Sequence, residues 1–128
     1  MNKYRLPDYL NDMERAAAKA CTYVAGLSWD DFHSNELVQD GVIRQISIIG
    51  EASARILHKY EGFTQTHADI QWKDIRGMRD ILIHDYGHVD LETVWDTARN
   101  FLPELLRQLP GLKQDAESRA PGRGLSSS

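Results

Sequence analysis

Apolar residues recur every three to four positions through most of this chain, a spacing that gathers them on one face of an α-helix. No stretch shows the strict alternation that a half-buried strand requires. The sequence therefore predicts an all-α fold, an up-down bundle of about four to five helices. The long helices are predicted at 6–24, 36–60, 71–84 and 91–109, with short helical turns at 28–32 and within a loop at 61–70.

Residues that start and stop helices stand at the ends of these segments. Pro7 suits a first helical turn, and Gly26 can end the first helix because glycine accepts the backbone angles found there. Ser28 and Asp31 form a capping-box pattern, in which each side chain accepts a hydrogen bond from the other residue's backbone N–H. Asp90 is predicted to cap the last helix.

Three residues inside the predicted helices are unfavourable there. Gly41 and Gly50 each cost about 1 kcal/mol relative to alanine. The small residues at 50–54 offer a compensation, because they allow another helix, from this chain or from a second copy, to approach closely. Pro103 is expected to bend the last helix, because it lacks a backbone donor and clashes with the preceding turn.

Length and composition limit the organisation of the chain and its function. The 128 residues suffice for one helical domain, predicted at 1–112, and the non-periodic end at 113–128 is predicted to be a disordered tail. The net charge of −4 argues against wholesale coating of nucleic acid, so any contact with RNA needs a local cationic cleft. The single Cys21 forms no internal disulfide. Because no apolar run has membrane-spanning length, we expect a cytoplasmic protein.

Arg79 stands within an apolar stripe of the predicted helix at 71–84. A guanidinium is always charged, so it must find a partner, reach water or line a cleft. One interpretation is a salt bridge to a carboxylate such as Glu51. The other is a cleft arginine that binds an anion such as phosphate. The apolar residues of the stripe are Trp72, Ile75, Met78, Leu82 and Ile83.

His84 and Tyr86 follow Arg79 at the end of the same segment. On an uninterrupted helix His84 points about 140° away from Arg79, so the two side chains meet only if the helix loosens or a second subunit closes the site. Tyr86 shares the face of Arg79 if the helical geometry continues that far. The arginine-to-histidine spacing alone is weak evidence. The apolar helix face, the histidine at a helix end and the nearby tyrosine strengthen it.

Four segments of the chain resemble the HepT-like ribonucleases within the HEPN superfamily of all-helical domains. The resemblance covers about residues 5–110, and the segments follow the order and spacing of the family. They are "YV.GLS...F" at 23–32, "QDGVIRQISIIGEASA" at 39–54, "W.DIRGMRDILIHDY" at 72–86 and "VD...VWDT......LPEL" at 89–105. The last two segments are the most specific to the family.

The resemblance implies a homodimeric endoribonuclease toxin of a type VII-like HEPN/MNT toxin–antitoxin system. Its active cleft would combine both copies of the catalytic pair Arg79 and His84 at the subunit interface, with Asp80 and Asp85 supporting or orienting that pair. The implied partner is a nucleotidyltransferase of the MNT type, which transfers AMP to the motif tyrosine, here Tyr86. The family often has asparagine or another polar residue after the arginine. Asp80 departs from this pattern and places negative charge near the path of the RNA.

These residue types can cleave RNA without a metal or a cofactor. In the hypothesis, the ribose 2′-hydroxyl attacks the adjacent phosphorus, His84 takes or gives a proton, and Arg79 stabilises the charge that grows on the phosphate. Lys73 and Arg76 are candidate RNA contacts on the same helix. The acidic residues interleaved with them leave a mixed, solvated face as an equal alternative.

Other interpretations remain open. His84 and His88 are four residues apart and could hold a metal ion, but no third ligand stands at a recognisable spacing. His58 and His67 are interpreted as surface or structural residues. No phosphate-binding glycine loop, CxxC pair or nucleophile elbow is present. A non-catalytic helical module that binds a nucleotide or a partner is an alternative to the enzyme, as is a scaffold in which Arg79 only forms a salt bridge.

Overall fold

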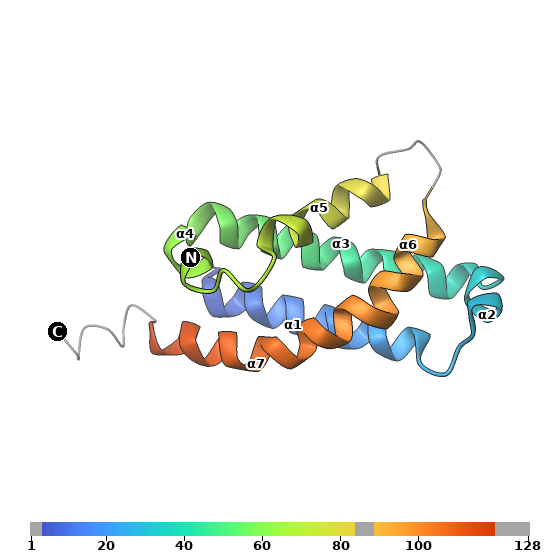
Figure 1. The fold of residues 1–128 in the computed structure, drawn as a ribbon, viewed down its shortest axis with the longest axis horizontal. Helices are drawn as coiled ribbons and strands as arrows, with labels where there is room; N and C mark the ends of the chain where they lie inside the picture. The colour runs from blue at the N-terminus through green and yellow to red at the C-terminus, as the bar shows by residue number, and fades with distance from the viewer. Residues whose placement is uncertain (1–3, 84–88, 120–128) are drawn as a thin grey trace.

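The computed structural model describes residues 4–83 and 89–119, and all regular secondary structure in these two ranges is helical (Figure 1). The all-α prediction is therefore confirmed for this part of the chain. No helix among the described residues combines the length and the apolar character needed to cross a bilayer. The elements are α1 (Leu6–Val24), α2 (Trp29–His33), α3 (Glu36–Lys59), α4 (Glu61–Thr66), α5 (Trp72–Ile83), α6 (Leu91–Asp96), η1 (Thr97–Phe101) and α7 (Leu102–Ser118).

The helix ends follow the predicted signals closely. Gly26 lies just beyond α1 with a φ of +77°, a conformation that favours glycine. The Ser28 side chain accepts from the Asp31 N–H and the Asp31 side chain accepts from the Ser28 N–H, both at 3.1 Å, so the predicted capping box is formed. Asp90 caps α6 by accepting from two backbone N–H groups, those of Glu92 and Thr93.

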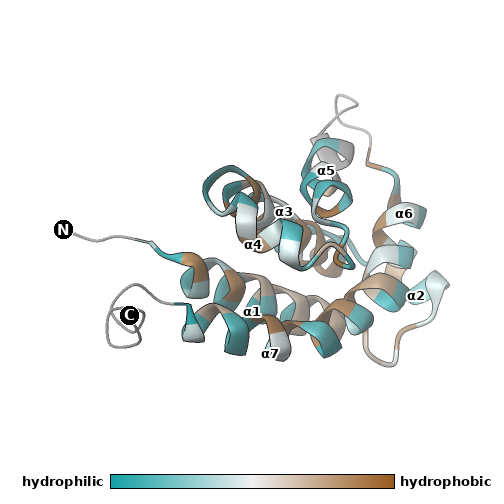
Figure 2. Cartoon of the chain, turned by 60° about the vertical axis from the view of Figure 1, so that its left-hand side comes forward, coloured by the Kyte–Doolittle hydropathy of each residue, from teal (hydrophilic) through white to brown (hydrophobic). Residues whose placement is uncertain are grey.

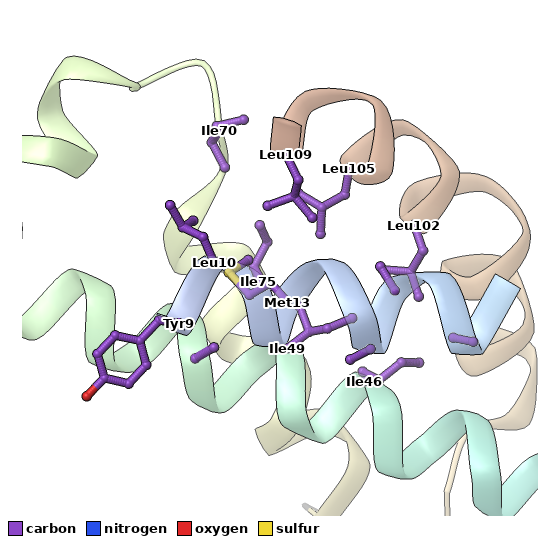
Figure 3. Close-up of a cluster of buried hydrophobic side chains, with 14 of the residues drawn as sticks. Tyr9, Leu10, Met13, Ile46, Ile49, Ile70, Ile75, Leu102, Leu105 and Leu109 are labelled. Carbon is purple, nitrogen blue, oxygen red and sulfur yellow. The ribbon is translucent and has the colours of Figure 1, made fainter. Parts of the chain in front are cut away.

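The bundle is layered around α3 and α1. α1 packs against both α3 and α7, and α5 packs against α3 on the side away from α1 (Figures 1 and 2). Apolar positions gather on the inner sides of these helices, and hydrophilic positions face outwards (Figure 2). Each large apolar side chain that becomes fully buried contributes about 1.5–3 kcal/mol. The side chains of the core in Figure 3 include Leu10, Met13, Ile46, Ile49, Ile75, Leu102, Leu105 and Leu109, all of them buried.

A π-helical segment connects α6 to α7. Residues 97–101 form η1, and Pro103 lies in the first turn of α7 immediately after it. The chain changes direction between α6 and α7 (Figure 1), as predicted for Pro103. The helix continues through this change, because the wider π winding accommodates the missing donor and the bulky ring of proline in the turn that precedes it.

The predicted domain boundary at residue 112 falls inside α7, so the prediction of a disordered tail is wrong for residues 113–118. Two contacts to distant residues hold this end in place. Lys113 Nζ lies 2.5 Å from Glu14 Oε1, and His67 Nε2 lies 2.7 Å from Asp115 Oδ2. The side chain of Ala116 is buried. The rest of the predicted tail, residues 120–128, lies outside the described residues.

The contact between His67 and Asp115 makes part of the stability dependent on pH. The hydrogen bond from His67 lowers the pKa of the Asp115 carboxyl below its ordinary value of 3.8, and the nearby charge of Arg119 adds to this effect. Because the folded-state pKa is the lower one, the contribution is fully present above about pH 4 and is lost as the pH falls through the folded-state pKa.

We therefore predict that Asp115→Asn flattens the acid side of the stability profile. Urea unfolding midpoints between about pH 5 and pH 2 should fall less steeply for this variant than for the unmodified chain. Asp69→Asn serves as the control, since Asp69 is exposed and pairs with no other residue in the described part of the chain. Equal slopes for Asp115→Asn and the unmodified chain would contradict the prediction.

Candidate functional site

α5 carries the described residues of the predicted site, and its first turn is fixed by two hydrogen bonds. Trp72 is buried, and its indole Nε1 donates to the backbone oxygen of His67 at 3.0 Å. The fully buried Ser53 hydroxyl, on α3, donates to the backbone oxygen of Trp72 at 2.8 Å. These bonds satisfy polar groups in the core and fix the start of α5 against α3.

Gly50 determines how closely α5 approaches α3 beside Arg79. A Cβ atom built on Gly50 would lie 3.1 Å from the Cβ of Arg79, 3.2 Å from its backbone nitrogen and 3.3 Å from the backbone oxygen of Ile75. These separations are shorter than ordinary van der Waals contacts. The close approach predicted for the small residues at 50–54 is thus confirmed, and the approaching helix belongs to the same chain.

Arg79 lies at the edge of the interface between α3 and α5, with its side chain 35% exposed. Its Nη1 forms an ion pair with Glu51 Oε1, and its Nε lies 3.7 Å from Asp80 Oδ1. Glu51 also pairs with Arg55 at 3.2 Å. The predicted salt bridge from Arg79 to Glu51 is therefore formed, and the guanidinium still reaches solvent.

This ion pair does not commit Arg79 to a purely structural role. The Glu51 side chain is 49% exposed, and exposed ion pairs contribute about 0–1 kcal/mol because water and salt screen them. An anion that approaches from solvent can therefore compete with Glu51 for the guanidinium at little cost.

In the predicted apolar stripe, Trp72 and Ile75 are buried and Met78 is partly buried.

The remaining residues of the predicted site follow directly after α5 in the sequence. His84, Asp85, Tyr86 and His88 lie outside the described residues, so their predicted roles and their distances to Arg79 stay predictions. Within residues 4–83 and 89–119, no group of three or more His, Cys, Asp and Glu side chains could hold a metal ion.

Lys73 and Arg76, the candidate RNA contacts, line an open groove that the sequence argument did not predict. Two adjoining cavities, of about 320 and 420 Å³, lie where the end of α3, α4 and the start of α5 meet. His58 on α3 and Gln65 on α4 contribute to the second cavity. The groove depends on the position of α4, and the sequence indicated only a loop with one helical turn there.

Cys21, on α1, packs against the core of the bundle. Its side chain is partly buried against the core, and its Sγ lies 3.9 Å from the backbone oxygen of Ala98. Burial raises the pKa of the thiol, which disfavours the reactive thiolate.

Comparisons with known proteins agree on one family. The family described as "Ribonuclease HepT-like" matches residues 13–111. The "Putative RNase TTE0752" of Caldanaerobacter subterraneus subsp. tengcongensis is 35% identical over 91 residues, which cover 71% of this chain and 79% of the relative. The "Probable ribonuclease HepT" of Thermococcus cleftensis is 34% identical over 107 residues, which cover 84% and 94%. No solved structure gives a significant match.

Substitution of two helical glycines tests how the site is held. Gly77→Ala, in α5, should stabilise the chain by about 1 kcal/mol, because helix propensity improves and an added Cβ meets nothing within 4 Å. Gly50→Ala should instead destabilise it by about 1–2 kcal/mol, since the added Cβ meets the backbone of α5 and overpacking outweighs propensity. Urea unfolding measures both changes. Equal stabilisation by the two substitutions would show that α5 is not held by close contact at Gly50.

Proposed function

The chain belongs to the ribonuclease HepT-like family, and on this basis we propose that it is a metal-independent endoribonuclease and the toxin of a type VII-like HEPN/MNT toxin–antitoxin system. The family match across residues 13–111 is the observation that supports the ribonuclease activity. The position of Arg79 supports its catalytic role, because the guanidinium is fixed on a packed helix and remains open to solvent. The proposed domain is the helical unit that the family match covers, extended to the end of α7.

In the proposed reaction, a ribose 2′-hydroxyl oxygen forms a bond to the adjacent phosphorus while the bond from phosphorus to the 5′-oxygen breaks. One His84 imidazole accepts the proton of the 2′-hydroxyl, and a second donates a proton to the departing 5′-oxygen. Arg79 binds the non-bridging phosphate oxygens and stabilises their growing negative charge. Asp80 and Asp85 would orient the catalytic pair. The products are a 2′,3′-cyclic phosphate and a 5′-hydroxyl.

A homodimer would supply the two histidines that this reaction needs. Each protomer has one Arg79 and one His84, and the proposed site combines both copies in one cleft at the subunit interface. The surface around Arg79 suits such an interface. Glu51 is exposed and Ile48 is partly exposed one helical turn before it, so an apolar and a charged group lie on the same side of α3.

We predict that the purified chain cleaves RNA in the presence of EDTA. Arg79→Ala and His84→Ala should each reduce the rate by at least about 100-fold, because general acid–base catalysis and stabilisation of the phosphate charge are lost. Lys19→Ala, on the exposed side of α1, is the control and should leave the rate unchanged. Expression should arrest growth, and His84→Ala should relieve the arrest. Full activity of the His84→Ala variant would remove this residue from the mechanism.

The second candidate function is a non-catalytic module that binds a nucleotide or a partner through the same residues. The exposed ion pair between Arg79 and Glu51 favours some role in binding anions, but it does not distinguish binding from cleavage. Cleavage of RNA in the presence of EDTA distinguishes the endoribonuclease from the binding module, because only the enzyme cleaves. A third possibility, a scaffold role, requires Arg79→Ala to lower the free energy of unfolding by clearly more than the roughly 1 kcal/mol of an exposed pair.

We further propose that a nucleotidyltransferase of the MNT type transfers the AMP group of ATP to the Tyr86 hydroxyl oxygen, with release of pyrophosphate and loss of the phenolic proton, and so inactivates the enzyme. The added group is bulky and anionic, and it would occupy the place of the substrate phosphate beside Arg79. Coexpression with the partner should add an adenylyl group to Tyr86, detected by mass spectrometry of peptides, and should abolish cleavage. Tyr86→Phe should block the modification and keep the enzyme active in the presence of the partner. An adduct on another residue, or none, would overturn this regulatory role.

A further inference from the structure

A groove adjoining α5 has the features of a binding site beyond the proposed catalytic residues. Its two cavities share Leu57, Thr64, Gln65 and Lys73, so they form one continuous depression at the junction of α3, α4 and α5. The larger cavity has a volume of about 420 Å³ and is lined by His58, Lys73 and Arg76 as well. This lining combines basic groups with apolar and amide side chains.

The basic side chains of the groove have no carboxylate partners among the described residues. Other arginines and lysines do form such pairs, for example Arg55 with Glu51 and Lys113 with Glu14. Lys73, Arg76 and His58 form no such pair in the described part of the chain. The unpaired charges of Lys73 and Arg76 around a concave surface favour an anionic ligand.

Two acidic residues also line the groove and limit its positive charge. Glu61 accepts a hydrogen bond from the amide of Gln65 at 3.3 Å, which occupies part of its carboxylate. Asp74 lines the smaller cavity, beside Lys73. The net positive charge is therefore concentrated in the larger cavity, where Lys73 and Arg76 face the single carboxylate of Glu61.

The basic residues of the groove form a row with Arg79 along α5. A helix rises about 1.5 Å and turns about 100° per residue, so Arg76 lies about 4.5 Å and Lys73 about 9 Å before Arg79 along the axis, and each is turned by about 60° around the helix from the next. Phosphates of one nucleic-acid strand follow one another at intervals of about 3.4 Å or more along its axis. A strand that crosses the helix obliquely can therefore place successive phosphates on these residues, whereas a single small anion cannot reach all three. This arrangement favours a polynucleotide over a single small anion.

We propose that this groove binds the sugar–phosphate backbone of the RNA strand next to the bond that is cleaved, an inference that rests on the proposed ribonuclease function. Lys73 and Arg76 bind phosphates, and the side chains of His58 and Gln65 donate hydrogen bonds to phosphate or ribose oxygens. Leu57, which is partly buried and lines both cavities, offers apolar surface to the sugars. These residues position the substrate and take no part in the bond-breaking step.

Salt-dependent RNA binding tests the groove directly. The full-length chain with His84→Ala, which keeps the RNA intact, is titrated onto a labelled single-stranded RNA of roughly 12 nucleotides at about 50 to 200 mM salt. Adding Lys73→Ala and Arg76→Ala should reduce the slope of log affinity against log salt by about 1.4, at about 0.7 per lost phosphate contact. The corresponding loss of affinity is about 25-fold at ~0.1 M salt.

The matched control removes two positive charges elsewhere. Arg15→Ala with Lys19→Ala changes the net charge equally, and both residues are exposed on α1, which packs against the opposite side of α3 from α5 (Figures 1 and 2). The control pair should leave the slope unchanged. If both pairs of substitutions lower the RNA affinity equally, the effect is one of overall charge and the proposed role of the groove is wrong. The same conclusion follows if the groove variant binds RNA as tightly as the unmodified chain.

Steady-state kinetics separate a failure of the groove from a failure of the proposed function. In chains that keep His84, the groove substitutions should raise KM by a factor similar to the loss of affinity and leave kcat unchanged. If the groove variants cleave RNA with an unaltered KM, the groove does not bind the substrate, but the ribonuclease function stands. If RNA binding depends on Lys73 and Arg76 but the unmodified chain does not cleave RNA, the groove stands and the proposed ribonuclease function is wrong.

Discussion

At Gly50 the backbones of α3 and α5 come closer than two side chains would permit, and the position of the candidate site depends on this contact. Glycine inside a helix is unfavourable, so the chain loses about 1 kcal/mol of helix stability there. In return, α5 lies directly against α3, with Trp72 and Ile75 buried beneath it. The same contact fixes the backbone of Arg79 on a packed surface. Because the backbone is already held, ligand binding has to order only the side chain of Arg79 and not the helix that carries it.

The charge distribution explains how an acidic chain can bind RNA. The net charge of −4 repels phosphate weakly at long range, but screening confines that repulsion to about 10 Å at ordinary salt concentrations. Close to α5 the local charges decide the interaction. Lys73 and Arg76 lack carboxylate partners in the described structure, and Arg79 has a partner that is itself half exposed. RNA binding would therefore be a property of one groove and would be sensitive to salt.

Sequence periodicity predicted the helices well because each helix buries an apolar face, and this need is visible within about fifteen residues. It could not predict contacts between distant residues. The composition of 113–118 indicated disorder, but Lys113 pairs with Glu14 and Asp115 with His67, which the chain brings together only on folding. The groove was missed for the same reason, since it exists only once α4 packs beside the start of α5. The sequence predicts the ion pair between Arg79 and Glu51 as one of two alternatives. It does not predict that this pair is exposed to solvent, because exposure depends on how α5 packs against α3.

Asp80 follows Arg79 directly in α5, and its carboxylate lies close to the guanidinium. A guanidinium has five N–H donors in a rigid plane. In Arg79 the Nη1 atom faces Glu51 and the Nε atom lies near Asp80, which leaves Nη2 without a carboxylate partner in the described structure. Both carboxylates are exposed, at 49% for Glu51 and 70% for Asp80, so the donors of Arg79 that face away from them remain open to a phosphate oxygen. Asp80 thus lowers the net positive charge around Arg79 without closing the guanidinium off from solvent. Because the Asp80 carboxylate is solvent-exposed, salt screens its repulsion of a phosphate, and the contact between an incoming anion and Arg79 decides the interaction at short range.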